Sequence, residues 1–306
     1  MPTIETIACR GWPNCRRVTN GSVELIATTD VGPRIIHFGF AGKTNLLKQY
    51  DDMMGRTGGD EWRLYGGHRL WHAPEQKPRT YCPDNGPVEA AAEGGVLRLT
   101  QPVEPTTGIR KQIEVRMADR GARVTLTHRL TNANLWTVPL APWSPTVMAP
   151  GGRCIIPLPP RGSHDTELLP TNTLVLWAYT DLTDPRWTLG RKYVMLQQDP
   201  QRPEPQKIGA SVPDGWVACA IGGQLFVKKF RHVDGAEYPD MGCSVETFTD
   251  GDMIEVETLG PMVTLAPGAT VEHVEDWFLF DDVAPADDDD SVDRDVLPKV
   301  RAAKVE

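Results

Sequence analysis

The alternation of apolar and polar residues along this chain predicts β-strands. Val23, Leu25 and Ala27 share one face of an extended segment that ends at the turn signal Asp30-Val-Gly-Pro33. Weak helical periodicity is confined to 43–54. Many short strands without alternating helices predict an antiparallel all-β fold, a large sandwich or barrel. Further strand-like runs lie at 96–99, 113–117, 124–130, 154–158, 173–179, 193–197, 216–221, 224–230, 243–249, 253–259 and 271–280.

Composition divides the chain into a folded body and an acidic end. The 306 residues are 40% apolar, enough for a substantial core, and no linker interrupts residues 1–280, which we predict to form one domain. Residues 281–295 hold eight Asp and one Arg, which contribute −7 of the net charge of −9. An Asp-rich stretch with few bulky apolar residues predicts a flexible, solvated tail over 281–306.

The sequence lacks the features that usually indicate several classes of protein. The near-neutral body has no basic stripe for nucleic acid, and no run of 18 apolar residues predicts a membrane span. The first residues do not resemble an export signal, and the six cysteines form no CxxC pair, so we expect free thiols in the cytoplasm. Motifs for serine hydrolases, NTPases and dinucleotide enzymes are missing. Nothing in the sequence indicates the oligomeric state.

The stretch 66–85 contains a dense group of acidic, basic and aromatic residues that could form a functional site. Its prolines predict an ordered loop, either a packed connection or a functional site. Two histidines beside a carboxylate suit proton transfer. Imidazole and carboxylate groups also bind divalent metals, so a metal site formed by His68, His72 and Glu75 is an alternative. The polar and aromatic candidates in the stretch are His68, Arg69, Trp71, His72, Glu75, Asp84 and Asn85.

Other candidates interrupt apolar strand faces. Lys111, His128 and Lys228 each share a strand face with apolar residues, because side chains two positions apart point the same way. Such residues lie at a strand edge or in the core, or they mark where a sheet opens into a cavity. Glu255 and Glu257 alternate with apolar neighbours and are expected to face solvent. After a turn signal come Tyr238, Asp240 and Glu246.

Several motifs together resemble the galactose mutarotase-like superfamily, and more closely a bacterial branch of it. The resemblance spans roughly residues 18–280. It rests most specifically on Gly-Gly-His-Arg-Leu-Trp-His-Ala-Pro-Glu75. The looser motifs are Asp-Val-Gly-Pro-Arg-Ile-Ile36, Leu-Ala-Pro-Trp143, Tyr-Pro-Asp240, Glu-Thr-Leu-Gly-Pro261, Leu-Ala-Pro-Gly268 and Trp277.

The resemblance implies a β-supersandwich that interconverts sugar anomers without a cofactor, in the manner of an aldose 1-epimerase. A glutamate would take the proton of the anomeric hydroxyl while a histidine protonates the ring oxygen. On this basis His68 is the expected acid, and Glu246 or Glu257 the expected base. Expected sugar contacts are Arg34, Arg69, Trp71, His72, Glu75, Asn85, Lys111, His128, Trp143, Lys228, Tyr238 and Asp240, with Trp71 and Trp143 as stacking surfaces.

Two alternatives remain at this point. The family's Asn-His-aromatic motif is absent, and Ala-Pro-Trp143 occupies its place. A non-catalytic carbohydrate-binding or sensing protein on the same fold would explain that absence. The other alternative is a metal-dependent lyase or isomerase that uses His68, His72 and Glu75, with His128 as a further ligand.

Overall fold

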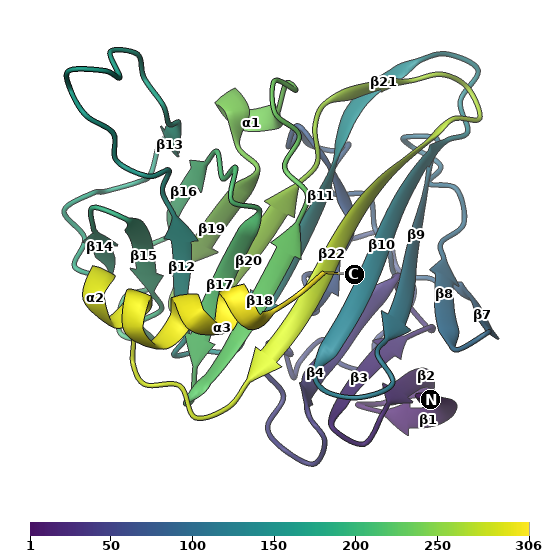
Figure 1. The fold of residues 1–306 in the computed structure, drawn as a ribbon. Coiled ribbons are helices and arrows are strands. Elements are labelled where there is room, and N and C mark those ends of the chain that lie inside the picture. Colours follow the sequence, from purple (N-terminus) through teal and green to yellow (C-terminus); the bar gives the residue numbers. More distant parts are fainter. Residues whose placement is uncertain (306) are drawn as a thin grey trace.

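The computed structural model, which describes residues 1–305, contains two large antiparallel sheets (Figure 1). The first has 12 strands within these residues. Along its main path they are β1 (Thr3–Cys9), β2 (Trp12–Thr19), β3 (Val23–Thr28), β4 (Arg34–Phe40), β5 (Gly67–Arg69), β11 (Val138–Met148), β20 (Ile254–Leu259), β19 (Val245–Thr249), β16 (Gln206–Ala210) and β13 (Leu174–Leu176). Two short strands, β6 (Trp71–Ala73) and β21 (Val263–Leu265), also pair with β11.

The second sheet has 10 strands in the same described part of the chain. In spatial order they are β14 (Trp187–Leu189), β15 (Tyr193–Gln197), β12 (Arg153–Pro157), β17 (Trp216–Ile221), β18 (Gln224–Phe230), β22 (Thr270–Phe280), β10 (Arg123–Asn132), β9 (Ile109–Met117), β8 (Val96–Thr100) and β7 (Glu89–Glu93). The all-β sandwich expected from the sequence is therefore confirmed.

The two sheets face each other across one main apolar core. Val245, Ile254 and Val256 project into it from the first sheet, and Phe226 and Trp277 project from the second. Because side chains alternate along a strand, the residues between these positions point to the opposite, outer face of each sheet. That alternation decides which polar side chains can meet.

The prediction of a loop over 66–85 was wrong at its start, where β5 and β6 form. Gly66 and Gly67 lead into β5 with φ angles of +94° and +70°, which favour glycine. A Cβ atom on Gly66 would lie 2.2 Å from the Lys48 carbonyl oxygen, and one on Gly67 would lie 2.1 Å from that of Ile35. The glycine pair is thus needed for close backbone approach. Residues 43–54 form bridges and turns in place of the weakly indicated helix.

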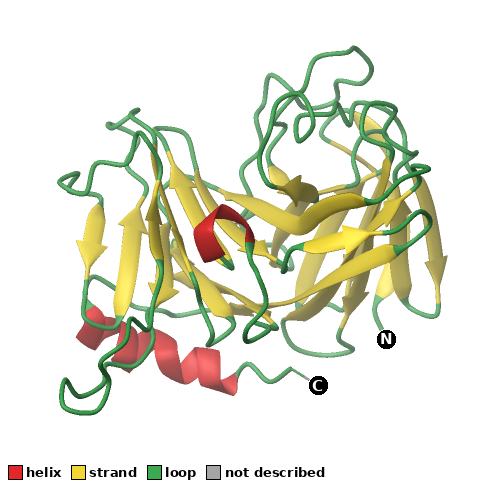
Figure 2. Ribbon diagram, turned by 90° about the horizontal axis from the view of Figure 1, so that it is seen from above, coloured by secondary structure: helices red, strands yellow, loops and turns green. Residues whose placement is uncertain are grey.

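The acidic end is structured, which corrects the expectation of a flexible tail. Residues 289–302, named here the C-terminal helix, comprise α2 (Asp289–Ser291), a π-helical segment (Val292–Val296) and α3 (Leu297–Ala302). This helix runs across the outer face of the second sheet (Figures 1 and 2). Val292, Val296 and Val300 bury one side of it against that sheet.

The acidic run favours this helix because of its position. Asp288 is the N-cap residue, and its Oδ1 accepts a hydrogen bond from the Ser291 amide at 2.8 Å. Asp289 and Asp290 occupy the first turn, where negative charge is favoured by the helix dipole. Among the described residues, no helix is both long and apolar enough to cross a membrane.

Candidate functional site

The outer face of the first sheet carries a group of buried charges. Val245 and Ile254 point inward, so Glu246, Glu255 and Glu257 point outward from β19 and β20. The expectation that Glu255 and Glu257 face solvent was wrong: Glu255 is 8% exposed and Glu257 is 0% exposed. Aromatic side chains from other strands and loops cover this face, which a pattern within one strand does not reveal.

A lysine lies between two of these carboxyl groups. Lys207 on β16 places its Nζ 2.7 Å from Glu246 Oε2 and 3.4 Å from Glu257 Oε2. The indole Nε1 of Trp143 donates a hydrogen bond to Glu257 Oε2 at 2.7 Å. Among residues 1–305, Glu246 Oε1 and Glu257 Oε1 have no hydrogen-bond partner. These two buried acceptor atoms are suited to ligand hydroxyl groups.

Burial shifts the protonation of this group. Burial raises the pKa of Glu257 to about 7, although Lys207 opposes the shift. Burial and the nearby Glu257 raise the pKa of Glu246 well above its ordinary value. Burial alone would lower the pKa of Lys207, but Glu246 and Glu257 outweigh it and raise that pKa. The site therefore combines a buried cation with one carboxyl group, that of Glu257, able to exchange a proton near neutral pH.

Aromatic rings form a wall beside these charges. Trp71 lies 5.1 Å from both Trp143 and Tyr81 between ring centroids, and Trp62 lies 5.6 Å from Trp71. The guanidinium carbon of Arg69 lies 4.2 Å from the ring centroid of Trp71. The Nη2 atom of Arg69 pairs with Glu255 Oε1 at 3.1 Å. Indole faces beside planar polar groups are chemically suited to the C–H faces and hydroxyls of a sugar.

A cleft of about 470 Å³ adjoins this wall. It is lined by Pro74, Met262 and residues 236–242, and Met262 also packs against the cluster that contains Trp71 and Trp143. The short helix α1 (Pro239–Gly242) at its rim contains Asp240 and Met241, both at positive φ. Met262 therefore places the cleft next to the aromatic wall.

His68 lies on the other side of the sheet. Its neighbour Arg69 points to the outer face, so the His68 side chain points into the core between the sheets. His68 Nε2 lies 2.7 Å from His128 Nε2, and its Nδ1 lies 2.8 Å from Thr146 Oγ1. Both of its ring nitrogens are thus engaged, and the structure does not bring His68 together with Glu246 or Glu257.

Lys228 belongs to the same interior network. Its Nζ lies 2.9 Å from Glu275 Oε1 and donates a hydrogen bond to the Ser144 carbonyl oxygen, also at 2.9 Å. Burial alone would raise the pKa of Glu275, but Lys228 and the neighbouring histidines outweigh it and lower that pKa. Burial lowers the pKa of His68 and His128. Lys228 and His128 therefore have partners inside the core and do not face the outer site.

Possible metal ligands occur in this interior network. One donor atom from each of His68, His128 and Glu275 lies within 4.8 Å of the others. His128 Nδ1 faces the His273 carbonyl oxygen at 3.0 Å, which orients its Nε2 toward His68. Both oxygens of Glu275, however, already accept hydrogen bonds, and Lys228 supplies the positive charge beside it. The donor set is therefore satisfied by the protein's own groups.

The ligand set of His68, His72 and Glu75 is not brought together. His72 points into the interior, where its Nε2 lies 3.6 Å from Glu104 Oε2. Lys111 Nζ lies 2.5 Å from the other oxygen of Glu104. His72 and Lys111, both expected sugar contacts, are therefore buried in the interior, where each pairs with Glu104. Glu75 is exposed and accepts a hydrogen bond from Tyr81.

The remaining predicted contacts lie around the site or support loops. Arg34 pairs with Asp84 at 2.7 Å and is the strand neighbour of Arg69. Asn85 accepts a hydrogen bond from the Tyr65 hydroxyl at 2.9 Å and donates to two loop carbonyls. Tyr238 stacks on His232, with ring centroids 4.8 Å apart, and its hydroxyl accepts from the Val233 amide.

Sequence reasoning missed Lys207. It lies on a five-residue strand, where it alternates with Ile208 and Ala210, two core residues. The segment Gln206–Ala210 follows a proline-rich stretch and contains Gly209, so its strand pattern is weak. The alternation Lys-Ile-Gly-Ala is the one signal that could have placed Lys207 on an outer face.

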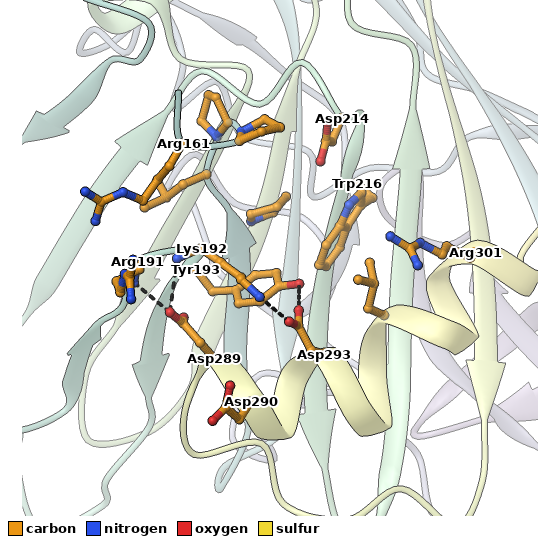
Figure 3. Close-up of a pocket in the computed structure, with 15 residues that line it drawn as sticks. Arg161, Arg191, Lys192, Tyr193, Asp214, Trp216, Asp289, Asp290, Asp293 and Arg301 are labelled. Atoms are coloured by element: carbon orange, nitrogen blue, oxygen red, sulfur yellow. Dashed lines mark hydrogen bonds and ion pairs between the residues drawn. The ribbon is translucent and has the colours of Figure 1, made fainter. Parts of the chain in front are cut away.

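A second cleft, of about 610 Å³, lies far from these charges in the fold, between the C-terminal helix and the second sheet (Figure 3). The Asp289 carboxylate accepts hydrogen bonds from the backbone amides of Arg191 and Lys192. Asp293 accepts from the Tyr193 hydroxyl at 2.7 Å. These contacts hold the helix to the sheet, so we regard this cleft as a structural junction.

Buried acids and aromatic rings thus lie together on one outer face of a two-sheet sandwich. No protein-family model and no curated protein matches the sequence. Solved structures do match. A galactose mutarotase-like protein from Lactobacillus casei has a TM-score of 0.54 and 10% identity, covering 87% of this chain and 100% of that one.

Two further solved structures are similar to this chain over most of its length. A putative aldose 1-epimerase from Klebsiella pneumoniae has a TM-score of 0.55 at 10% identity, covering 100% of this chain and 88% of that one. A TPR-domain containing protein from Parabacteroides distasonis has a TM-score of 0.57 at 14% identity over 89% of this chain; the match spans 48% of that protein, about half its length. This chain therefore has the galactose mutarotase-like fold, and the predicted resemblance is confirmed at the level of the fold.

Proposed function

We propose that this chain binds a sugar or sugar derivative on the outer face of the first sheet and interconverts its anomers without a cofactor. The observation that carries the proposal is Glu257, a fully buried carboxyl group whose pKa is raised to about 7 beside an aromatic wall. A carboxyl group with that pKa can accept and return a proton at neutral pH. The mutarotase-like fold supports the choice of a sugar as ligand.

The proposed reaction moves two protons. The ionised member of the pair formed by Glu246 and Glu257 takes the proton of the anomeric hydroxyl. The protonated member gives its proton to the ring oxygen as the bond from that oxygen to the anomeric carbon breaks. The open-chain aldehyde rotates, and the reverse steps close the ring and return both protons. This assignment replaces His68 as the acid, because that side chain lies inside the core.

Other expected features form part of the same proposal. Arg69, Trp71 and Trp143 remain candidate sugar contacts, since all three line the outer face. The partner would be a small carbohydrate. We also retain the cytoplasm as the expected location, because all six cysteines are free thiols.

The test begins with thermal-shift screening against neutral sugars, uronates, sugar phosphates and deoxy sugars. A ligand at about 100 times its Kd adds roughly 2.7 kcal/mol of stability, which raises the melting temperature measurably. Polarimetry on each ligand found then follows mutarotation with the wild-type protein, with Glu257→Gln, and with the exposed control Glu272→Gln. We expect Glu257→Gln to lower the rate by about 10²–10⁴-fold. Full activity of Glu257→Gln, or no acceleration by the wild type, would contradict the proposal.

A second candidate function is non-catalytic sugar binding or sensing. It is favoured by the absence of the Asn-His-aromatic motif, whose place is taken by Ala141–Trp143. In that case the same ligands would stabilise the protein in the thermal-shift experiment, but polarimetry would show no acceleration. The two measurements together separate the candidates.

A further inference from the structure

Lys207 is a buried cation beside the carboxyl groups of the candidate site. It is 4% exposed, although a lysine is rarely buried without partners. Its ammonium group lies 4.9 Å from the ring centroid of Trp143 and 4.7 Å from that of Trp177. Two indole faces and two carboxyl groups therefore surround the cation, and each of them favours its charged form.

The two carboxyl groups beside it face each other across neighbouring strands. Glu246 on β19 and Glu257 on β20 are directly paired in the antiparallel register. Directly opposite side chains on one sheet face have Cβ atoms about 5 Å apart, and like charges in that arrangement repel. Both residues are 0% exposed, so water does not screen that repulsion.

One lysine can offset the charge of only one carboxylate at such a position. Glu255, which could add to the repulsion, is itself paired with Arg69. Two buried carboxyl groups that interact closely exchange protons as a unit, because ionising both at once is unfavourable. The Lys207 ammonium is nearer to Glu246, at 2.7 Å, than to Glu257, at 3.4 Å.

We propose that Lys207 is a positioning residue that keeps a single proton on the pair formed by Glu246 and Glu257. With one proton, the pair contains an acid and a base at the same time, which anomer interconversion requires. The inference rests on the proposed function for its purpose, but it concerns the protonation of the protein and can be tested without substrate.

The experiment is a ¹³C NMR titration of the Glu side-chain carboxyl groups, with Glu257→Gln and Glu246→Gln used to assign their signals. The variant Lys207→Met removes the charge and keeps the length of the side chain, whereas Lys207→Arg keeps the charge. An opposite charge at this distance lowers a carboxyl pKa by about 1–3 units, so Lys207→Met should raise the titration midpoint of Glu257 by about that amount. Lys207→Arg should stay close to the wild type.

Two results would overturn the inference: an unchanged midpoint in Lys207→Met, or an equal rise in Lys207→Arg. If Lys207→Met does not fold, Glu246→Gln gives an independent test. It removes the competing carboxylate, so Lys207 should then lower the midpoint of Glu257, and an unchanged or higher midpoint would overturn the proposal. Polarimetry judges the proposed function separately, since an inactive protein with the expected titration would refute that function alone.

Discussion

At the scale of single residues, the burial of Glu257 makes the free energy of unfolding depend on pH. Its folded-state pKa is about 7, above the ordinary value of 4.5. A carboxyl group with a raised pKa stabilises the folded state most below the unfolded pKa, and this contribution is lost as pH rises through the folded pKa. The wild-type protein therefore carries an increasing penalty from this residue between about pH 4.5 and pH 7.

Glu257→Gln should consequently gain stability relative to the wild type as the pH is raised. The amide cannot ionise, so the difference in unfolding free energy between variant and wild type should move in favour of the variant by roughly 3 kcal/mol between pH 4.5 and pH 8. Urea unfolding at both pH values measures it. Glu272→Gln, at a largely exposed site, should show no such trend, and a pH-independent difference for Glu257→Gln would contradict the expectation.

The residue scale also shows where sequence reasoning ends. Alternation along residues 253–259 correctly separated Glu255 and Glu257 from Ile254 and Val256. Alternation could not show whether the strand face that carries the glutamates is exposed to solvent, because the aromatic rings that cover this face come from β6, β11 and the loops around them. The same limit applied to His68, whose direction depends on the register of β5.

At the scale of elements, the C-terminal helix contributes an apolar face to the second sheet. Val292, Val296 and Val300 pack with residues that include Tyr193 and Trp216. The spacing of four residues places these valines on one side of the helix. The acidic composition of the segment obscured this short pattern, which explains why a tail was predicted.

Truncation of the central valine should measure that contribution. Val296→Ala removes two buried methyl groups and should destabilise the protein by about 1–3 kcal/mol. The exposed Arg294→Ala on the same helix should change stability by less than about 0.5 kcal/mol. Thermal and urea unfolding test the pair, and equal effects of the two substitutions would show that the helix is not docked in solution.

Strand prediction succeeded where alternation was uninterrupted and failed at special residues. β10, β17, β18 and β22 match the expected runs closely. β11 contains Pro139, Pro142 and Pro145, which obscure a strand pattern although it lies inside the first sheet. No strand was predicted there, and Leu-Ala-Pro-Trp143 entered only as a motif of the family resemblance, although β11 carries Trp143, a central residue of the candidate site.

At the scale of the whole molecule, the two sheets enclose a polar network within their apolar core. His273 lies 2.7 Å from Thr258 Oγ1 through its Nε2, and burial lowers its pKa from 6.5 to about 3. This depressed pKa means that the folded protein holds His273 neutral while the unfolded chain takes up a proton. Its contribution is therefore present above about pH 6.5 and is lost as the pH falls toward 3.

His273→Gln should make the protein less sensitive to acid. A glutamine can keep a hydrogen bond to Thr258 but cannot take up the proton, so the variant should lose about 2 kcal/mol less stability than the wild type between pH 6.5 and pH 5. Unfolding free energies at the two pH values test this. His164→Gln, on a fully exposed side chain, is the control; parallel pH curves for His273→Gln and the wild type would refute the argument.

The architecture was predictable from sequence because periodicity and turn residues act throughout the chain. The assignment of side chains to faces required three-dimensional register. His68 and Lys228 were grouped with Glu246 and Glu257, yet a sheet separates them. Composition and spacing identify which groups are unusual, but they do not specify which of these groups meet.

This separation has an evolutionary consequence. His68 and Arg69 are neighbours in sequence, yet one supports the interior and the other lines the outer face. A mutation at an outward position can therefore change the chemistry of the candidate site while the hydrogen bonds between the sheets stay intact. Lineages that share this scaffold could therefore vary the outer face without first losing the ability to fold.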